Sequence, residues 1–542
     1  MLTTLVLLTA TTLLSHNAHL VLASLPTLKL SGSPSLPADS SYPLSPALAS
    51  FSIETAFFEE FVGNTSSPNT LTRNLLENLK ARTGTPAEVR IGGITADSTY
   101  WDPNLNVSLS NFIDKTGALQ NTTIGPGFWN SVKLLPEGTK ITMNLDLQDL
   151  DYQGALSVAT AALKGLSTQL VGFEIGNEPD HYLSFTPKNY TNVWATWAKN
   201  ISTTLKLNGP EFQIAATAED PLWPYTAPGA SSQLDCVSAL AAGANNAGIV
   251  KTCSEHTYQY SVCDPPRIAV ATLPNLVNHT RLAVYLDLWQ PRIKSVRAQL
   301  GPESFVIGEY NSVSCSGKDG VSNTFGQALW LLDTTFYAAS LNVSRLYIHQ
   351  GGPLALQSST QLNHGGLSFY DLWYPVQNLN GPVKVFPSYS AYLFVTETLG
   401  QSKSLRISNI YPGRQSNGST ITTALGDQSA GQLVAYGFWD DASPSGHKFP
   451  TKLALLNLEI FNQTQSAPRP SSVFDISAFL RDSNQPVTIR RLQAPGADVK
   501  EANVTTWAGQ NFASGLASGK LVEEKVSGGK IKLQASEAAL VF

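Results

Sequence analysis

The stretch LVGFEIGNEP, residues 170–179, decides the fold that we expect for this chain. It begins as an apolar run with the length and composition of a buried β-strand, and it ends in Gly-Asn-Glu-Pro. A glutamate is costly to place where an apolar strand leaves the core, unless its carboxylate lines a polar pocket. A second run, SFVIGEYN at residues 304–311, also ends near a glutamate. Both stretches therefore predict strands that deliver a carboxylate, Glu178 or Glu309, to a polar site.

Six further runs of this kind make eight strand candidates between about residue 50 and residue 400. The eight candidates occupy residues 51–58, 88–93, 140–147, 170–177, 213–219, 250–260, 304–311 and 345–350. Amphipathic, helix-like stretches lie between them at residues 154–166, 187–205, 281–300 and 324–341, and residues 387–400 follow as a last helix. Strands that alternate with helices are typical of a parallel sheet, and eight such units form a (β/α)8 barrel. We expect this α/β TIM barrel to span residues 48–400.

The pattern changes after residue 400 to short alternating segments separated by Gly, Pro, Ser and Asn. These segments are residues 419–425, 431–439, 451–461, 471–479, 486–494 and 530–542. Alternation with turn residues predicts an appended antiparallel β-sandwich domain over residues 401–542. One strand-like piece within residues 24–47, LPTLKLSG at residues 25–32, is expected to add a strand to it.

Composition and charge limit the class of protein. Apolar residues make up 42% and charged residues 14%, which indicates a globular chain rather than a disordered one. The net charge of -5 provides no basic surface for nucleic acid, so we expect no such partner. Residues 1–23 combine an apolar run with small residues before Ser24 and predict a signal peptide, although no Lys or Arg precedes the run. We expect a secreted, extracellular protein that does not span a membrane.

Glycosylation sequons support a secretory route. Ten Asn-x-Ser/Thr sites occur, at Asn64, Asn106, Asn121, Asn189, Asn200, Asn278, Asn342, Asn417, Asn462 and Asn503. Single sequons arise by chance, but ten behind a leader favour a glycoprotein that carries N-glycans.

The four cysteines form an even set that an oxidising compartment pairs in one of three ways. We expect Cys253 to pair with Cys263, because the loop between them is short. No CxxC pair or suitable His spacing supports tetrahedral zinc, so no metal site is expected.

The two strand-end glutamates suit glycoside hydrolysis. One carboxylic acid protonates the departing oxygen, and a second carboxylate attacks the anomeric carbon or activates water. The strands that carry Glu178 and Glu309 are the fourth and seventh of the predicted barrel, which face each other across its mouth. This arrangement permits the separation of about 5–5.5 Å that a retaining enzyme needs.

Three motifs resemble glycoside hydrolase family 79, within the clan of retaining (β/α)8 glycosidases. They are RIGGITADSTYWDP at 90–103, GFEIGNEPDHY at 172–182 and VIGEYNS at 306–312, and the appended sandwich agrees with them. The layout resembles the fungal secreted members, and the family contains β-glucuronidases, 4-O-methyl-glucuronidases and heparanase-type enzymes. The resemblance implies that Glu178 is the acid/base, that Glu309 is the nucleophile and that Asn177 holds the sugar 2-hydroxyl.

The assignment of roles predicts unequal environments for the two glutamates. Glu178 is expected to have a raised pKa so that it stays protonated until the leaving group takes its proton. Tyr258, at the end of the sixth strand, is expected to hydrogen-bond Glu309 and keep it ionised. For Tyr258 and its neighbour His256, simple packing at a strand end is the alternative interpretation.

Other strand-end residues are candidates for binding the sugar. Glu54 and Asp97 are expected to bind hydroxyl groups, with helix capping or pairing with Arg90 as the alternative. No arginine at the strand ends is placed to bind a glucuronate carboxylate. The resemblance implies backbone amides instead, and the N–H groups of Gly351 and Gly352 lack a shielding Cβ. Tyr370 adds a hydroxyl, but it follows a stretch that reads as an insertion.

The sequence therefore predicts a retaining exo-β-glucuronidase that releases terminal glucuronic acid, with or without a 4-O-methyl group, from glycans and needs no cofactor. A β-glucosidase, a β-xylosidase or a heparanase-like endoglucuronidase of the same clan remains the nearest alternative, because the glutamates do not define the group at C5. A non-catalytic carbohydrate-binding protein on the same barrel is the alternative from another class.

Overall fold

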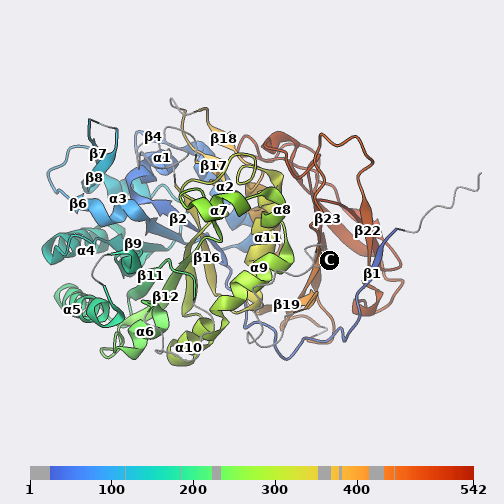
Figure 1. Ribbon diagram of the computed structural model, residues 1–542, viewed down its shortest axis with the longest axis horizontal. Coiled ribbons are helices and arrows are strands. Elements are labelled where there is room, and N and C mark those ends of the chain that lie inside the picture. The colour runs from blue at the N-terminus through green and yellow to red at the C-terminus, as the bar shows by residue number, and fades with distance from the viewer. Residues whose placement is uncertain are drawn as a thin grey trace, which may run out of the picture.

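The computed structural model of the chain describes residues 25–115, 117–182, 185–221, 233–351, 368–377, 381–413, 432–444 and 446–542. The predicted leader, residues 1–23, and the strand-like segment 419–425 lie outside these ranges. A barrel surrounded by helices and a smaller all-β domain lie side by side (Figure 1).

Eight parallel strands close into the barrel. In chain order they are β2 (Ala49–Glu54), β5 (Val89–Gly92), β9 (Ile141–Leu145), β10 (Leu170–Ile175), β11 (Phe212–Thr217), β12 (Val250–Thr257), β14 (Phe305–Tyr310) and β16 (Arg345–Gln350). The last strand pairs with the first, with Leu346 opposite Ala49. Each strand falls at a predicted position, because its apolar side chains fill the space between the barrel and the surrounding helices. The predicted TIM barrel with an appended β-sandwich is confirmed.

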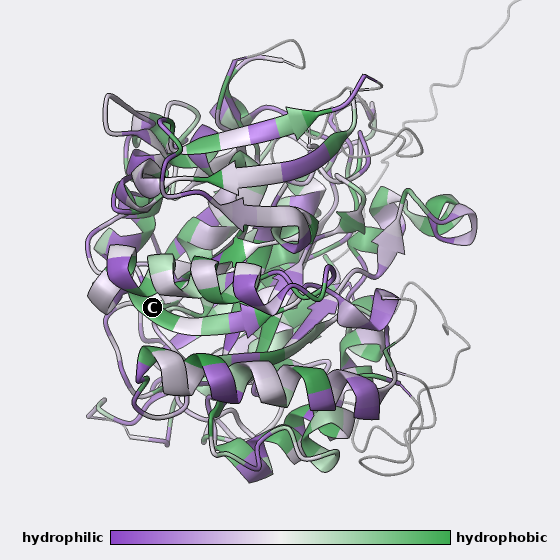
Figure 2. Ribbon diagram, turned by 90° about the vertical axis from the view of Figure 1, so that its left-hand side faces the viewer, coloured by the Kyte–Doolittle hydropathy of each residue, from purple (hydrophilic) through white to green (hydrophobic). Residues whose placement is uncertain are grey.

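Helices cover the outside of the barrel. The longer ones are α2 (Thr70–Thr83), α4 (Tyr152–Leu166), α5 (Pro187–Leu205), α9 (His279–Leu286), α10 (Gln290–Leu300), α11 (Phe325–Ser340) and α12 (Tyr389–Leu399). Shorter ones are α1 (Phe58–Val62), α3 (Pro126–Val132), α6 (Cys236–Ala241), α7 (Pro265–Val270) and α8 (Leu273–Leu276). Outer helices carry hydrophilic and hydrophobic residues in turn along their length, as amphipathic helices do (Figure 2).

Local sequence explains where individual helices begin and end. Thr186 accepts a hydrogen bond from the N–H of Asn189, and Pro187 occupies the first turn of α5. The single helix expected over residues 281–300 is instead two, α9 and α10. Pro291 lies in the first turn of α10, where its missing N–H costs nothing, whereas in the interior of one long helix it would break the hydrogen-bond ladder.

Several short strands lie in the connections. β6 (Thr99–Trp101), β7 (Leu109–Ile113) and β8 (Leu119–Ile124) form a small sheet after β5 that the sequence analysis did not predict. Two-stranded pairs are β3 (Gly63–Asn64) with β4 (Ser67–Pro68), β13 (Tyr260–Ser261) with β15 (Val313–Ser314), and β17 (Trp373–Tyr374) with β18 (Lys384–Val385).

The second domain has two sheets. The larger contains β19 (Leu405–Tyr411), β20 (Leu433–Asp440), β21 (Lys452–Asn457), β27 (Glu537–Val541), β23 (Val487–Gln493), β24 (Thr506–Trp507) and β25 (Glu524–Val526). The smaller contains β1 (Thr27–Lys29), β22 (Ser471–Asp475) and β26 (Lys530–Gln534), and β1 pairs in parallel with β22. Apolar residues of both sheets, including Leu455 and Phe474, share one core.

The other face of the larger sheet packs on the barrel through α11 and α12. Every residue of α11 is buried, because the helix lies between barrel and sandwich. The ring of Phe336 packs 5.1 Å from that of Phe438, and Asp333 accepts a hydrogen bond of 2.6 Å from Tyr436. The two domains therefore share an apolar interface. Among the described residues, we find no helix with the length and apolar character needed to cross a bilayer.

The disulfide joins Cys263 to Cys315, so the expected Cys253–Cys263 pairing is wrong. Cys253 lies inside β12 and is buried as a free thiol, as is Cys236. Each strand residue advances the chain by about 3.3 Å, so the strand beyond Cys253 carries the backbone further than the roughly 7 Å that a disulfide tolerates between Cα atoms. Cys263 instead meets Cys315 where β13 pairs with β15. Short sequence separation was a poor guide because an extended strand separates its own residues.

We predict that peptide mapping of the oxidised protein finds a crosslink between the peptides of Cys263 and Cys315, with alkylation of Cys236 and Cys253 only after denaturation. The double variant Cys263→Ser/Cys315→Ser should lower the free energy of unfolding by about 4 kcal/mol, because the bond closes a long loop in the unfolded chain. Urea denaturation measures this change. A crosslink between Cys253 and Cys263 would contradict the structure.

Candidate active site

A cavity of about 660 Å³ opens at the carboxyl ends of the barrel strands. Its inner part is lined by Glu54, Asn177, Glu178, Tyr258, Glu309, His349 and Tyr370. Its outer part is lined by Ile94, His181, Ala218, Glu219, Asp220, Gln233, Arg267 and Ser314 to Ser316. The carboxyl end of a TIM barrel is where active sites of this fold lie, and the volume suits one or two sugar rings.

The turn after β10 places Glu178. The chain turns at Gly176, where φ is 89°, and Glu178 itself has a φ of 52°, in the left-handed region that non-glycine residues rarely adopt. The N–H of Glu178 donates to the carbonyl oxygen of Ala216 on the neighbouring strand at 2.9 Å. Unusual backbone angles that are held by neighbouring strands are frequent at functional sites.

Arg90, on β5, connects the residues beneath the cavity. Its guanidinium is completely buried and donates to Glu174 at 2.7 Å, to Glu309 at 2.8 Å and to the side-chain oxygen of Asn177 at 2.7 Å. Ser52 accepts a further hydrogen bond at 3.0 Å. A buried arginine needs such partners, since burial of an unpaired charge is very costly. Arg90 therefore sets the positions of Glu309 and Asn177 together.

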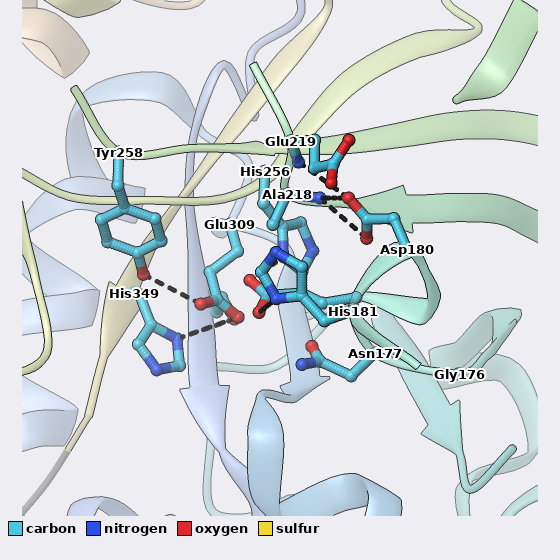
Figure 3. Close-up of polar contacts among 12 residues, drawn as sticks. Gly176, Asn177, Asp180, His181, Ala218, Glu219, His256, Tyr258, Glu309 and His349 are labelled. Carbon is cyan, nitrogen blue, oxygen red and sulfur yellow. Dashed lines mark hydrogen bonds and ion pairs between the residues drawn. The ribbon is translucent and has the colours of Figure 1, made fainter. Parts of the chain in front are cut away.

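Glu309 lies in an environment that favours its ionised form. Tyr258 donates to Oε1 at 2.9 Å, and His349 faces Oε2 at 3.6 Å (Figure 3). Arg90 donates to Oε2 at 2.8 Å. Burial would raise the pKa of Glu309, but the charges of His349, His256 and Arg90 outweigh it and lower the pKa. Glu309 is therefore an anion at the bottom of the cavity.

Two imidazoles face Glu178. Nδ1 of His256 lies 3.0 Å from Oε1, and Nδ1 of His181 lies 3.6 Å from Oε2. Burial would raise the pKa of Glu178, but the close contact with His181 and the hydrogen bond with His256 outweigh it, so the pKa falls well below its usual value. The expectation of a raised pKa is therefore wrong. The sequence did not reveal that both histidines turn towards this carboxylate.

The two glutamates approach each other across the cavity. One carboxylate oxygen of Glu178, one of Glu309 and a ring nitrogen of His256 all lie within 4.8 Å of one another. These three groups have the chemistry and spacing of metal ligands. The same spacing suits a pair of carboxylates on either side of one anomeric carbon, for which retaining enzymes use about 5–5.5 Å.

Asn177 and Glu54 line the inner cavity. The side-chain oxygen of Asn177 accepts from Arg90, which turns its NH2 group towards the cavity. Glu54 accepts from the N–H of Thr95 at 2.7 Å, and its other oxygen lies 3.1 Å from Nε2 of His349. Both side chains are therefore oriented by neighbours before any ligand arrives.

Asp97 lies behind the cavity rather than in its lining. Its carboxylate accepts from the backbone N–H of Asn177 at 3.2 Å and from the hydroxyl of Tyr182. Burial raises the pKa of Asp97, and the nearby Asp146 adds to this effect. Asp97 thus supports the turn that carries Asn177, and the expectation that it contacts sugar is not supported by its position.

Three residues were predicted to bind the glucuronate carboxylate: Tyr370, Gly351 and Gly352. Tyr370 lines the cavity, with its ring 6.5 Å from that of Tyr258 and 6.0 Å from that of His349. The N–H of Gly351 donates to Asp371 at 2.9 Å, so the expectation that this amide is free for substrate is wrong. A neighbouring carboxylate that is distant in the sequence occupies it. Gly352 lies outside the described residues.

Four polar residues of the site were not identified as such from the sequence: Arg90, Glu174, His181 and His349. Each was visible only as a polar residue within or just after an apolar strand. A polar residue between apolar neighbours in a strand, such as Arg90 in Val89–Gly92, points into the barrel, and this alternation would have indicated a site residue. The partners of Arg90, Glu174 and His349 lie on other strands and are therefore hidden from any local pattern, whereas His181 lies three residues after its partner Glu178.

Comparisons with known proteins agree with this arrangement. Residues 435–540 match the model of the glycosyl hydrolase family 79 C-terminal beta domain. A β-glucuronidase of Neurospora crassa is 28% identical over 524 residues, which cover 89% of this chain and 87% of that protein. A β-glucuronidase of Aspergillus niger is also 28% identical, over 90% of this chain and 87% of that protein.

Solved structures agree on the fold. A 4-O-α-L-rhamnosyl-β-D-glucuronidase from Fusarium oxysporum matches with a TM-score of 0.73 and 24% identity, over 95% of this chain and all of that one. A family 51 arabinofuranosidase from Xanthomonas axonopodis matches with a TM-score of 0.60 and 12% identity, over 93% of this chain and 97% of that one. The resemblance to family 79 and the expectation of a glycoside hydrolase are confirmed.

We predict that Tyr258→Phe moves the acidic limb of the pH profile of kcat/KM to higher pH by one to two units. The hydroxyl stabilises ionised Glu309, and a hydrogen bond to a charged group contributes roughly 1.5–3 kcal/mol. Loss of that bond raises the pKa of Glu309. As the pH falls, the carboxylate is therefore protonated, and activity is lost, at a higher pH than in the wild type.

The matched control is Tyr260→Phe, two residues further along the chain. Its hydroxyl donates to the carbonyl oxygen of Asn275 and not to Glu309. This variant should leave the acidic limb in place, and an equal shift in both variants would contradict the role given to Tyr258.

Proposed function

Starting from a chain that resembles glycoside hydrolase family 79 in both its barrel and its sandwich, we propose that the protein is a retaining exo-β-glucuronidase. Its substrate is a terminal β-linked glucuronic acid of a glycan, with or without a 4-O-methyl group, and no cofactor takes part. The observation that carries the proposal is the pair of carboxylates, Glu178 and Glu309, whose oxygens lie within 4.8 Å of each other in one cavity.

In the first step, Glu309 attacks the anomeric carbon and forms a glycosyl-enzyme ester while the bond from that carbon to the glycosidic oxygen breaks. Glu178 supplies the proton that this oxygen takes as the aglycone departs. Tyr258 must release or redirect its hydrogen bond, because the attacking carboxylate loses its charge. Arg90 keeps the carboxylate of Glu309 oriented throughout.

In the second step, water attacks the same carbon and gives a proton to Glu178, and the ester to Glu309 breaks. The NH2 group of Asn177 is turned towards the cavity by Arg90 and donates to the sugar 2-hydroxyl oxygen. That contact strengthens as positive charge develops on the ring, so it stabilises the transition state more than the bound substrate.

The hydroxyl of Tyr370 is the group that we assign to the glucuronate carboxylate, because the one O–H of the neighbouring Tyr258 already donates to Glu309. Burial raises the pKa of both hydroxyls well above the usual value, so both remain protonated donors. His349 adds positive charge, since Glu309 and Glu54 raise its pKa against the opposing effect of burial. A neutral glucoside offers no carboxylate for the hydroxyl of Tyr370.

The charge of the cavity disfavours a heparanase-like function. Its described lining contains the carboxylates of Glu54, Glu178, Glu219, Asp220 and Glu309 but only one arginine, Arg267. A sulfated polymer requires the opposite balance. A short, polar glycan with a single terminal acid is the better match.

We also propose that the enzyme is secreted and carries N-glycans. The leader-like residues 1–23, the disulfide and several exposed sequons support this, among them Asn106, Asn189, Asn200 and Asn503. Asn278 is the exception: its side chain is 3% exposed and caps α9 by accepting from the N–H of Arg281, so it is a poor acceptor.

The decisive experiment measures hydrolysis of 4-nitrophenyl β-glucuronide and 4-nitrophenyl β-glucoside by the wild type and by Glu309→Ala. The wild type should prefer the glucuronide at least about 100-fold in kcat/KM, since buried donors left without the carboxylate lose their partners. Glu309→Ala should lose about 10⁴-fold or more. Preference for the glucoside would refute the substrate assignment and leave the reaction type intact.

The control for the nucleophile is Glu303→Ala, at an exposed glutamate before the same strand, near the opposite end of the barrel. It should hydrolyse the glucuronide as the wild type does. Full activity in Glu309→Ala would remove the double-displacement mechanism.

Tyr370→Phe tests the assignment of the carboxylate-binding hydroxyl. We expect kcat/KM to fall about 10–100-fold for the glucuronide and less than about threefold for the glucoside, because one charge-assisted hydrogen bond is lost with the acid only. Equal losses for both substrates would show that Tyr370 contributes only to packing.

A further inference from the structure

Glu178 has an imidazole at each of its carboxylate oxygens. His256 meets Oε1 at 3.0 Å, and His181 meets Oε2 at 3.6 Å. The two histidines come from different elements, β12 and the turn Pro179–His181 that follows the glutamate (Figure 3). A single histidine would suffice to orient the carboxylate, so the second one calls for a separate explanation.

The two imidazoles differ in their access to solvent. The side chain of His256 is 0% exposed and belongs to a barrel strand, so it is held in place by packing. The side chain of His181 is 57% exposed and lies in the outer part of the cavity. The departing part of the substrate must pass on this outer side, since the inner part is the dead end of the barrel. His181 is therefore the imidazole beside the leaving group.

The charges around the pair favour a proton on His181. Acidic groups face it from its own turn, Glu178 and Asp180, and from the end of β11, Glu219. The ion-pair contact with Glu178, at 3.6 Å, raises the pKa of His181 to about 9 against the opposing effect of burial, and Asp180 and Glu219 add negative charge.

The remaining charged groups face Glu178 and Glu309 rather than His181. They are His256 on β12, Arg90 on β5 and His349 on β16. Among the described residues of the outer lining, Arg267 is the one further cation, and it lies near Asp220. Near neutral pH the pair of His181 and Glu178 thus holds one proton, and in this arrangement the proton rests on the imidazole.

We propose that His181 is a positioning residue for the general acid. It holds the proton that Glu178 gives to the glycosidic oxygen, and its imidazole is protonated again at the end of each turnover. This inference rests on the function proposed above. When the glycosidic oxygen approaches Glu178, the N–H bond of the imidazolium breaks and Glu178 becomes a carboxylic acid. The O–H bond of that acid then breaks as the glycosidic oxygen takes the proton and the bond to the anomeric carbon opens.

The second half of the reaction restores the pair. Attacking water loses a proton to Glu178 while its oxygen bonds to the anomeric carbon and the ester to Glu309 breaks. The proton then moves from Glu178 to the neutral imidazole of His181. One proton enters and one leaves in each cycle, so no co-reactant is needed.

The variant His181→Gln tests the inference through the alkaline limb of kcat/KM for an alkyl β-glucuronide, whose leaving oxygen needs a proton. In the wild type the pair loses its proton only as the pH rises through the raised pKa of His181. Without the imidazole, the proton must be held by Glu178 itself, whose pKa is lower. The alkaline limb should therefore move to lower pH by at least one unit, with activity at least about tenfold lower at pH 7.5 and largely recovered on acidification.

A leaving-group series gives a second readout on the same proteins. An alkyl or sugar β-glucuronide needs a proton on its leaving oxygen, whereas 4-nitrophenolate departs without one. His181→Gln should therefore lose at least about tenfold more activity on the alkyl glucuronide than on the 4-nitrophenyl glucuronide.

The matched control is His447→Gln in the sandwich domain. His447 is 51% exposed and also pairs with a carboxylate, that of Asp441, but it is absent from the described lining of the cavity. It should leave the pH profile and the leaving-group dependence unchanged. Thermal unfolding of both variants shows whether either substitution disturbs the fold.

The outcomes separate this inference from the proposed function. If the wild type hydrolyses glucuronides and His181→Gln loses activity by one factor at every pH and for every leaving group, His181 has only a structural role and the inference is wrong. Unchanged activity in His181→Gln overturns it as well. If the wild type hydrolyses another β-glycoside instead, the proposed substrate fails, and the same two readouts with that glycoside still decide the role of His181.

Discussion

The structure of the site depends on one buried charge, the guanidinium of Arg90. Removing a guanidinium from water costs several kcal/mol, and only close, well-oriented partners offset that cost. Arg90 has them in Glu174, Glu309 and Asn177, at 2.7 to 2.8 Å. Glu174 lies on β10 and Asn177 just after it, whereas Glu309 lies on β14, so Arg90 connects three strands of the barrel. Because the buried charge of Arg90 must be balanced inside the barrel, its partners Glu309 and Asn177 are held in fixed positions at the mouth of the barrel.

Retaining hydrolysis needs two carboxylates of the same residue type to behave differently, and their surroundings provide this difference. Glu309 accepts from fixed donors, Arg90 and Tyr258, so its charge is stabilised before substrate arrives. Glu178 faces the imidazoles of His256, which is buried, and His181, which is half exposed and to which we assign the stored proton. The nucleophile is thus surrounded by groups that keep it charged, whereas the acid lies beside an imidazole that can lend and recover a proton.

The sandwich domain contributes to the site indirectly. All described residues that line the cavity belong to the barrel and its loops. The sandwich instead buries α11 and α12 against its larger sheet, with Phe394 packed 4.7 Å from Trp507. The sandwich thereby covers two helices that would otherwise expose apolar surface. The barrel and the second domain consequently share one continuous apolar core.

The sequence by itself determined the barrel strands, the change to a sandwich and the two glutamates, because apolar periodicity and the residues that end each run are local properties. Only the tertiary structure decided the partners. Cys263 pairs with Cys315 rather than with Cys253, the N–H of Gly351 is occupied by Asp371, and the pKa of Glu178 is lowered by His181 and His256 rather than raised by burial. Bond partners and pKa values depend on distances of a few ångströms between distant parts of the chain, and closure of the barrel alone sets those distances.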